Sequence, residues 1–195
     1  MRKTVWRVLL CVSLLLVLFV PTALAKKQTL TERQEALRQK VTLALDKLYA
    51  KQPKAEGALA GATGRAVFVS SGYKLGLFGS SHGRGIAYNN QTDEEVFMRM
   101  NEYEAGLGLG AKEYILVFAF ANQEAWDSFV KKGWSFGGKA EMSATDGVNG
   151  DSFEGAIQVA PGIWVYQLTT KGLSMSLALK GTNYYRDKEM NGDKK

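Results

Sequence analysis

The residue types that most often carry catalysis are scarce in this chain of 195 residues. Its single histidine, His82, follows Ser80 and Ser81 in a glycine- and serine-rich segment that predicts an exposed turn. A serine hydrolase needs only one histidine, but no G-x-S-x-G elbow accompanies this pair. Cys11 is the one cysteine and lies in the N-terminal apolar segment, which excludes a zinc site and a cysteine–histidine pair. We therefore expect no catalytic residue, no metal and no cofactor.

Two further segments resemble ligand-binding motifs without meeting their requirements. Glycine occupies every second place from Gly106 to Gly110, but a strand follows where a dinucleotide site needs a helix N-terminus. Alternating glycines are expected instead to remove side chains from one face of a strand, so that another group can approach closely. The acidic segment Asp146–Asp151 does not place its oxygen donors at the first, third and fifth positions of a calcium loop. It is expected to be a loop.

Basic residues at helical spacing are the strongest candidates for a binding site. A helix is predicted from Thr29 or Thr31 to about Ala50, because Thr29 with Glu32 and Thr31 with Gln34 both fit a capping box. A period of 3.6 residues places these aliphatic residues on one face: Leu30, Leu37, Val41, Ala44, Leu45 and Leu48. The following basic residues line one flank of that face: Arg33, Lys40, Lys47 and Lys51.

Two interpretations of this helix remain open. Its apolar face can pack on the rest of the protein, since burial of four such side chains would contribute about 1.5–3 kcal/mol each. Alternatively, the apolar face can lie on a membrane, with the basic side chains beside it at the level of the phosphates. Each Lys or Arg near an anionic surface then contributes about 1 kcal/mol, screened by salt.

The N-terminal residues predict export. Residues 1–25 combine a basic start, an apolar stretch over Val8–Val20 and the small-residue cleavage pattern Ala23-Leu24-Ala25. The alternative is an uncleaved anchor, because Val5–Ala25 is just long enough to span a bilayer. We expect a cleaved signal peptide and a periplasmic or secreted protein, peripheral to a membrane. Without Cys11 the remaining chain has no disulfide.

Charge is unevenly distributed along the chain. Residues 26–54 hold eight basic and three acidic side chains, whereas residues 55–195 hold 14 basic and 16 acidic side chains. A basic arm with a net charge of +5 is thus joined to a body with a net charge of −2. Because the leader contributes three of the basic residues, the high isoelectric point is weak support for nucleic-acid binding. We expect no nucleic-acid partner.

The body is predicted to consist of short strands with one inserted helix. The apolar run Tyr114–Ala121 is expected to form a strand buried on both faces. A short helix should follow it, with Asn122 as N-cap and Gly133 as C-cap. Its apolar residues Trp126, Phe129 and Val130 should lie on the sheet. Tight turns are expected at Pro161-Gly162 and Lys171-Gly172.

The other expected strands are short and separated by turn residues: Arg65–Ser71, Lys74–Phe78, Gly85–Tyr88, Val96–Met100, Trp134–Met142, Ser152–Ala160, Ile163–Thr170, Leu173–Lys180 and Thr182–Arg186. The predicted fold is therefore α+β and predominantly antiparallel β, with a barrel- or sandwich-like body, an N-terminal amphipathic helix and one inserted helix. We expect three parts: a signal peptide (1–25), the basic helix (26–55) and a glycine-rich β body (56–190).

Several of these segments together resemble the SYLF domain. The resemblance rests on Gly64–Val69, the glycine-punctuated Gly72–Gly85 segment, Ala105–Ala111 with the apolar run after it, and Lys171–Thr182. It covers roughly Leu37 to Arg186. Where relatives tend to have small apolar residues, this chain has Thr145-Asp146-Gly147.

The resemblance implies a non-enzymatic lipid-binding module, found in bacterial secreted proteins and in eukaryotic endocytic proteins that bind membranes and regulate actin. Some relatives bind phosphoinositides partly through an N-terminal basic helix, which implies that Arg33, Lys40, Lys47 and Lys51 contact headgroups here. The expected function is binding of anionic phospholipid through that helix. The alternative is a periplasmic interaction or structural module with a protein partner, whose helix is buried in its own core.

Overall fold

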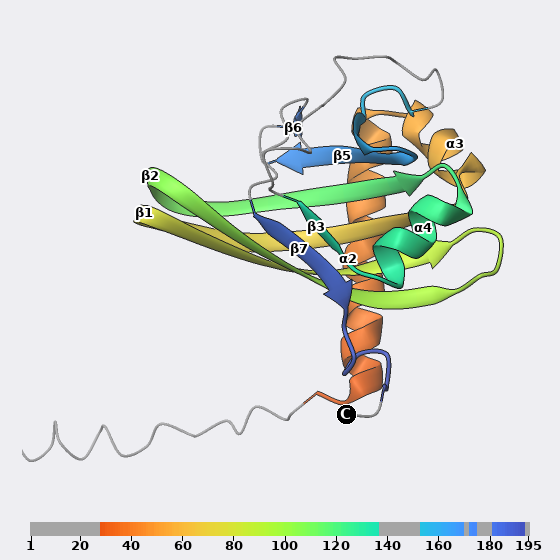
Figure 1. The fold of residues 1–195 in the computed structure, drawn as a ribbon, viewed down its shortest axis with the longest axis horizontal. Coiled ribbons are helices and arrows are strands. Elements are labelled where there is room, and N and C mark those ends of the chain that lie inside the picture. Colours follow the sequence, from red (N-terminus) through yellow and green to blue (C-terminus); the bar gives the residue numbers. More distant parts are fainter. Residues whose placement is uncertain (1–27, 137–152, 170–171, 175–180, 194–195) are drawn as a thin grey trace, which may run out of the picture.

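The computed structural model describes residues 28–136, 153–169, 172–174 and 181–193 (Figure 1). Within these residues it contains three helices and a seven-stranded antiparallel sheet that curves into a half-barrel. The predicted α+β fold with a mainly antiparallel body is confirmed. The signal-peptide prediction, the acidic loop at 146–151 and Thr145 lie outside the described residues.

A long helix crosses the outer side of the sheet (Figure 1). This helix, α2 (Leu30–Lys51), starts with the predicted capping box: the backbone N–H of Glu32 donates to Thr29 Oγ1, and the N–H of Thr29 donates to the Glu32 carboxylate. A second helix, α3 (Lys54–Gly61), follows directly. The sequence analysis did not predict α3, because its two glycines and the preceding Pro53 favour a break in the helix.

Two strands of unusual length make up most of the sheet. β1 (Gly64–Asn89) pairs with β2 (Glu95–Phe120) in antiparallel register from Gly64–Phe120 to Tyr88–Glu95, with one register shift between Gly76 and Phe78. The prediction of several short strands in this region is therefore wrong. The pairing continues on both sides of the register shift, and the ribbon doubles back on itself at its far end (Figure 1).

The remaining strands extend the sheet from the free edge of β2. Its first half pairs with β7 (Thr182–Arg186), which also pairs with β3 (Trp134–Phe136). Its second half pairs with β5 (Ile163–Thr169), which also pairs with β4 (Ile157–Ala160) and β6 (Gly172–Ser174). The turn at Pro161-Gly162 is confirmed, with Gly162 at a φ of 72°. Lys171 lies outside the described residues.

Both faces of the ribbon are covered near its two ends. Even-numbered residues of the apolar run, such as Phe118, pack in an inner core against α4 (Gln123–Val130). Odd-numbered residues, such as Val117, pack against α2 and α3 in an outer core. The prediction of a doubly buried strand is confirmed. So is the inserted helix, in which Asn122 accepts a hydrogen bond from the N–H of Ala125 and Trp126, Phe129 and Val130 are buried.

Candidate functional site: a basic groove beside α2

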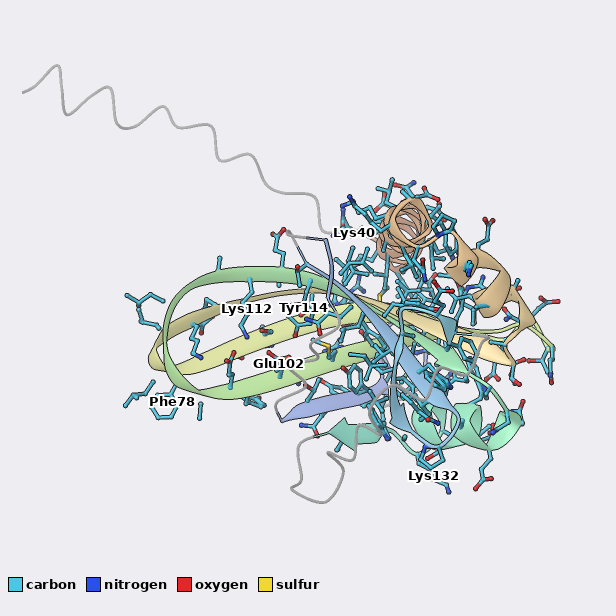
Figure 2. All side chains as sticks on the ribbon, turned by 90° about the horizontal axis from the view of Figure 1, so that it is seen from above. Lys40, Phe78, Glu102, Lys112, Tyr114 and Lys132 are labelled. Carbon is cyan, nitrogen blue, oxygen red and sulfur yellow. The ribbon has the colours of Figure 1, made fainter. Side chains whose placement is uncertain are left out.

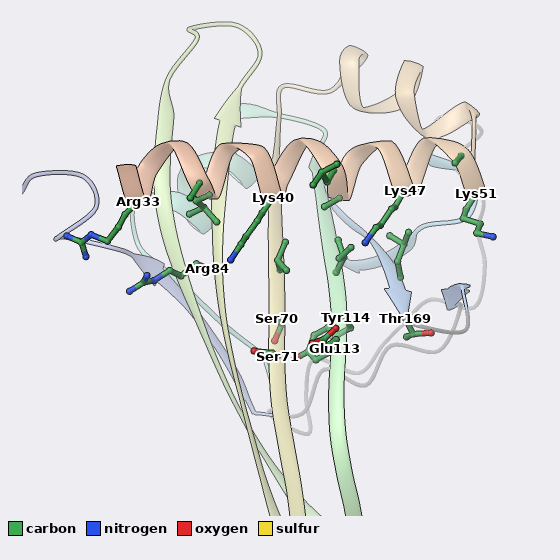
Figure 3. A pocket seen from close by; sticks show the side chains of 18 of the residues that line it. Arg33, Lys40, Lys47, Lys51, Ser70, Ser71, Arg84, Glu113, Tyr114 and Thr169 are labelled. Carbon is green, nitrogen blue, oxygen red and sulfur yellow. The ribbon is translucent and has the colours of Figure 1, made fainter. Parts of the chain in front are cut away.

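A groove of about 820 Å³ runs between α2 and the outer face of the β1–β2 ribbon. Figure 3 shows α2 along one wall and the two strands crossing below it. We call this the α2 groove. It has five basic lining residues and one acidic lining residue among the residues that the structure describes: Arg33, Lys40, Lys47, Lys51, Arg84 and Glu113.

All four basic residues predicted from the sequence therefore line a single groove. Arg33, Lys40 and Lys47 are spaced two turns of α2 apart, Lys51 follows one turn later, and all four point toward the same side (Figure 3). Arg33 forms an ion pair with Glu189 at 2.9 Å. Within the described part of the chain, Lys40, Lys47 and Lys51 have no carboxylate within 4.0 Å, and all three residues are exposed. These three lysines carry the uncompensated charge of the groove.

The apolar face of α2 is not available to a membrane in this structure. Leu37, Ala44 and Leu48 are buried, and Val41 and Leu45 are packed against the same cores. The interpretation in which the apolar face of α2 lies on a bilayer is therefore wrong. This face packs on the protein itself, because the ribbon has apolar residues opposite it. Leu43 differs, with 59% of its surface exposed at the groove.

Specific polar contacts fix α2 on the body. The Arg38 guanidinium donates to the Glu95 carboxylate, with its closest contact at 2.7 Å. The Gln34 side-chain amide donates to the backbone carbonyl of Met190 at 2.7 Å. Hydrogen bonding to Glu95 raises the pKa of Arg38 further above its usual value, against the opposing effect of burial. These contacts hold one end of the groove against the β2 start and the C-terminal segment.

The sequence analysis missed the opposite wall of the groove. Arg84 comes from β1, directly after the residues that were predicted to form an exposed turn, and its Nε lies 3.9 Å from Asp187 Oδ2. The floor contains polar residues from both strands and from β5: Ser70, Ser71, Glu113, Tyr114 and Thr169. Val69 and Ser71 lie two residues apart on β1, and Glu113 and Ile115 lie two residues apart on β2. This spacing indicates which side chains share a face of each strand. The register that pairs the two strands was not visible in the sequence.

A network of charged side chains lies beyond the floor, inside the ribbon (Figure 2). The Tyr114 hydroxyl donates to Glu102 Oε2 at 2.6 Å, and Lys112 Nζ donates to Glu102 Oε1 at 3.3 Å. Lys112 and Lys74 both contact the Glu104 carboxylate. Burial and then the hydrogen bond to Glu102 raise the pKa of Tyr114 far above its usual value. Tyr114 is therefore a neutral donor at physiological pH.

The structure also places the residues considered for catalysis. Ser81 is buried and its hydroxyl lies 3.4 Å from Glu102 Oε1, whereas His82 is exposed. Adjacent residues of a strand point to opposite faces, so these two side chains diverge. The expected turn here is wrong, since Gly79–Gly83 is part of β1. No cluster of three metal-binding side chains occurs among the described residues. Within the same residues, no helix has the length and apolar composition needed to span a bilayer.

Comparisons with known proteins identify the domain. Residues 101–193, from β2 onward, match the family described as "Ysc84: Las17-binding protein actin regulator". The chain is also 32% identical over 165 residues to Beta cell expansion factor A of Aeromonas veronii, an alignment that covers 84% of this chain and 60% of that protein. This chain thus spans less than two thirds of that relative's length. The resemblance seen in the sequence is confirmed over residues 101–193, which match the Ysc84 (SYLF) family.

Proposed function

We propose that the protein binds anionic phospholipid headgroups in the α2 groove and has no catalytic role. The single observation that supports this most strongly is the convergence of basic side chains from α2 and β1 on one groove. A phosphate oxygen can accept hydrogen bonds from several such donors at once. Because the apolar face of α2 is buried, headgroup binding relies on the exposed basic flank and does not require the helix to leave the body.

The expected strength is modest and dependent on salt. Lys40, Lys47 and Lys51 are exposed, and each would contribute about 1 kcal/mol near an anionic surface. Together they correspond to roughly a hundredfold preference for anionic over neutral membranes. Screening over about 8 Å at physiological ionic strength should reduce this preference as salt is added.

Family membership supports the proposal at a coarser level. The family suggests a lipid-binding or actin-regulator-like role, and it is generally non-enzymatic. The Aeromonas veronii relative is named a beta cell expansion factor, which says nothing about a ligand. The leader pattern in residues 1–25 supports export, and we place the protein at a periplasmic or extracellular membrane surface.

Vesicle co-sedimentation tests the proposal. The purified chain should bind phosphatidylcholine vesicles that contain phosphatidylglycerol, bind much less to phosphatidylcholine alone, and dissociate at high salt. Lys40→Glu with Lys47→Glu should lower binding to the anionic vesicles at least tenfold, because two attractive charges become repulsive. Binding that is indifferent to phosphatidylglycerol would contradict the proposal.

A matched charge reversal provides the control. Lys131→Glu with Lys132→Glu changes the net charge by the same amount at exposed positions after α4. Lys132 lies on the opposite side of the body from Lys40 (Figure 2). This control should retain nearly all of the binding. Equal losses in both double variants would indicate attraction to overall charge and would contradict a site in the groove.

The burial of the apolar face of α2 favours a second candidate, a protein-interaction or structural module. In that case the groove would accept an acidic segment of a partner protein. Failure to bind any vesicle, together with strong hydrogen-exchange protection of α2, would favour this candidate.

A further inference from the structure

The far end of the β1–β2 ribbon carries a group of exposed apolar side chains that the α2 groove does not use. There the ribbon doubles back and projects away from the helices (Figure 1). Six large apolar residues in this region are each between 58% and 80% exposed: Tyr73, Leu75, Leu77, Phe78, Tyr103 and Leu109. We call them the apolar tip. Monomeric proteins rarely expose large apolar residues in one contiguous group unless that surface has a partner.

The apolar tip contains residues from both halves of the folded-back ribbon. Leu75 is paired with Leu109 on the outer face. Phe78, which follows the register shift after Gly76, lies beside Tyr73 and Tyr103 around a shallow hollow. In Figure 2 the Phe78 side chain points outward at the end of the ribbon. The six side chains thus surround the end of the folded ribbon, where the interfacial layer of a bilayer can cover all of them together.

The charged residues of the same segment point away from this surface. Lys74 forms an ion pair with Glu104 at 2.8 Å, and their side chains are only 16% and 11% exposed. Lys112 contacts the same carboxylate. The charges are thus neutralised inside the ribbon. The two tyrosines lie farther from the bend than Leu75 and Leu109, which is the order of aromatic and aliphatic residues found where proteins enter a membrane interface.

The outer face of the ribbon connects the tip to the α2 groove. Val69 and Ser71 line the groove, and Tyr73 and Leu75 follow them at the same face of β1. From Ser71 to Leu75 the strand advances about 13 Å. A membrane that supplies headgroups to Lys40 and Lys47 therefore lies within reach of the tip.

We infer that the apolar tip inserts into the interfacial layer of the same anionic bilayer, an inference that rests on the proposed function. The insertion is shallow, because β2 between Glu102 and Tyr114 pairs only with β1 among the described residues. The N–H of Tyr103 donates to the carbonyl of Gly181, but among the described residues no strand pairs with the rest of this edge, and unpaired backbone groups cannot be satisfied in the hydrocarbon core. The groove provides attraction to the charged surface, and the tip provides the apolar contact that the buried face of α2 does not.

Site-specific labelling tests the insertion. In a Cys11→Ser background, Phe78→Cys, Leu109→Cys and the control Lys132→Cys are each labelled with an environment-sensitive fluorophore. With vesicles of phosphatidylcholine and phosphatidylglycerol, the two tip labels should shift to the blue and be quenched by lipids carrying a spin label near the headgroup. The Lys132→Cys label should do neither. Tip labels that stay in water while the protein co-sediments with the vesicles would overturn the inference and leave the proposed function intact.

Substitutions measure the contribution of the tip. Leu75→Ser with Leu109→Ser should weaken vesicle binding about tenfold or more, since full withdrawal of one leucine from water corresponds to roughly tenfold to a hundredfold and shallow insertion withdraws each leucine in part. Leu75→Met with Leu109→Met keeps an apolar tip and should bind like the wild type. Both variants should keep the wild-type circular dichroism spectrum, because the side chains are exposed.

Two further outcomes would also overturn the inference. If the serine variant converts a dimer into a monomer without altering vesicle binding, the tip is an interface between two copies of the chain. If the wild-type protein binds no anionic vesicle, the proposed function fails together with the insertion. Light scattering after size-exclusion chromatography and co-sedimentation of the unlabelled wild type distinguish these results.

Discussion

Two glycine-to-alanine substitutions should have opposite effects on stability and so test how the ribbon folds on itself. At Gly85, an added Cβ would lie 2.3 Å from the backbone carbonyl oxygen of Val67 and 2.6 Å from a ring carbon of Phe68. Both residues belong to the other half of β1. At Gly57, in the exposed part of α3, an added Cβ would meet nothing within 4 Å.

The expected magnitudes follow from these distances. The Gly85 contact must open by about 0.7 Å to reach even 3.0 Å, and the obstructing atom is backbone. Overpacking of this kind costs about 1–3 kcal/mol and occasionally more, so Gly85→Ala should lose about 3 kcal/mol of unfolding free energy. Gly57→Ala should gain about 0.5–1 kcal/mol, because alanine has less freedom to lose in a helix.

Urea unfolding, followed by tryptophan fluorescence and by circular dichroism, measures both changes. The corresponding melting temperature should fall by about 6–12 °C for Gly85→Ala and rise by about 1–4 °C for Gly57→Ala. If Gly85→Ala stays within about 0.5 kcal/mol of the wild type, which is usual for a surface substitution, then the two halves of β1 are not in contact in solution. The half-barrel would then be open.

Three further substitutions test buried polar groups. Tyr166→Phe removes a buried hydroxyl with no hydrogen-bond partner among the described residues, and should raise the unfolding free energy by roughly 1 kcal/mol in urea titrations. Burial raises the pKa of Tyr166 to about 12, so ionisation of this side chain is less favourable in the folded than in the unfolded state. The wild type should therefore lose stability as the pH rises from about 10 to 12, and the variant should lose less. Tyr114→Phe removes the donor to Glu102 and should instead cost about 1.5–3 kcal/mol; a gain in both tyrosine variants would contradict this network. Burial raises the pKa of Asp187, but the hydrogen bond and charge of Arg99 outweigh it and place the pKa below its usual value. Asp187→Asn should therefore be less stable near neutral pH, and its difference from the wild type should shrink as acid unfolding is followed below about pH 4; a difference independent of pH would refute the role of the charge.

The elements that were predicted correctly are those marked by residues close together in the sequence. The capping box at Thr29 and Glu32 placed the start of α2 within a residue. Asn122 and the change from a strand period to a helix period located α4. The apolar run after Glu113 indicated a strand with two covered faces, since only such a strand lacks alternation. Each of these signals depends on residues within a few positions of one another.

The long ribbon could not be predicted in this way. Glycines and serines between Gly72 and Gly85 predict turns when they are considered locally. In the structure these residues are part of the long strand β1. Gly85 and Gly72 allow the two halves of β1 to approach through backbone contacts. Close approach was expected at Gly106–Gly110, yet a Cβ at Gly110 would meet nothing within 4 Å. Close approach to a glycine therefore occurs in β1, at Gly72 and Gly85, and is absent at Gly110.

The position of the candidate site follows from one face of this ribbon. Under α2 the odd-numbered residues Val67 and Val117 are apolar and pack in the same core as the helix. At Ser71, paired with Glu113, the same face becomes polar, and the helix no longer has an apolar surface to cover. The groove opens there, beside the basic flank of α2. The face becomes apolar again at Leu75, where no helix covers it. Because these residues alternate between apolar and polar along one strand pair, the polar floor of the groove separates the two parts of the proposed membrane contact.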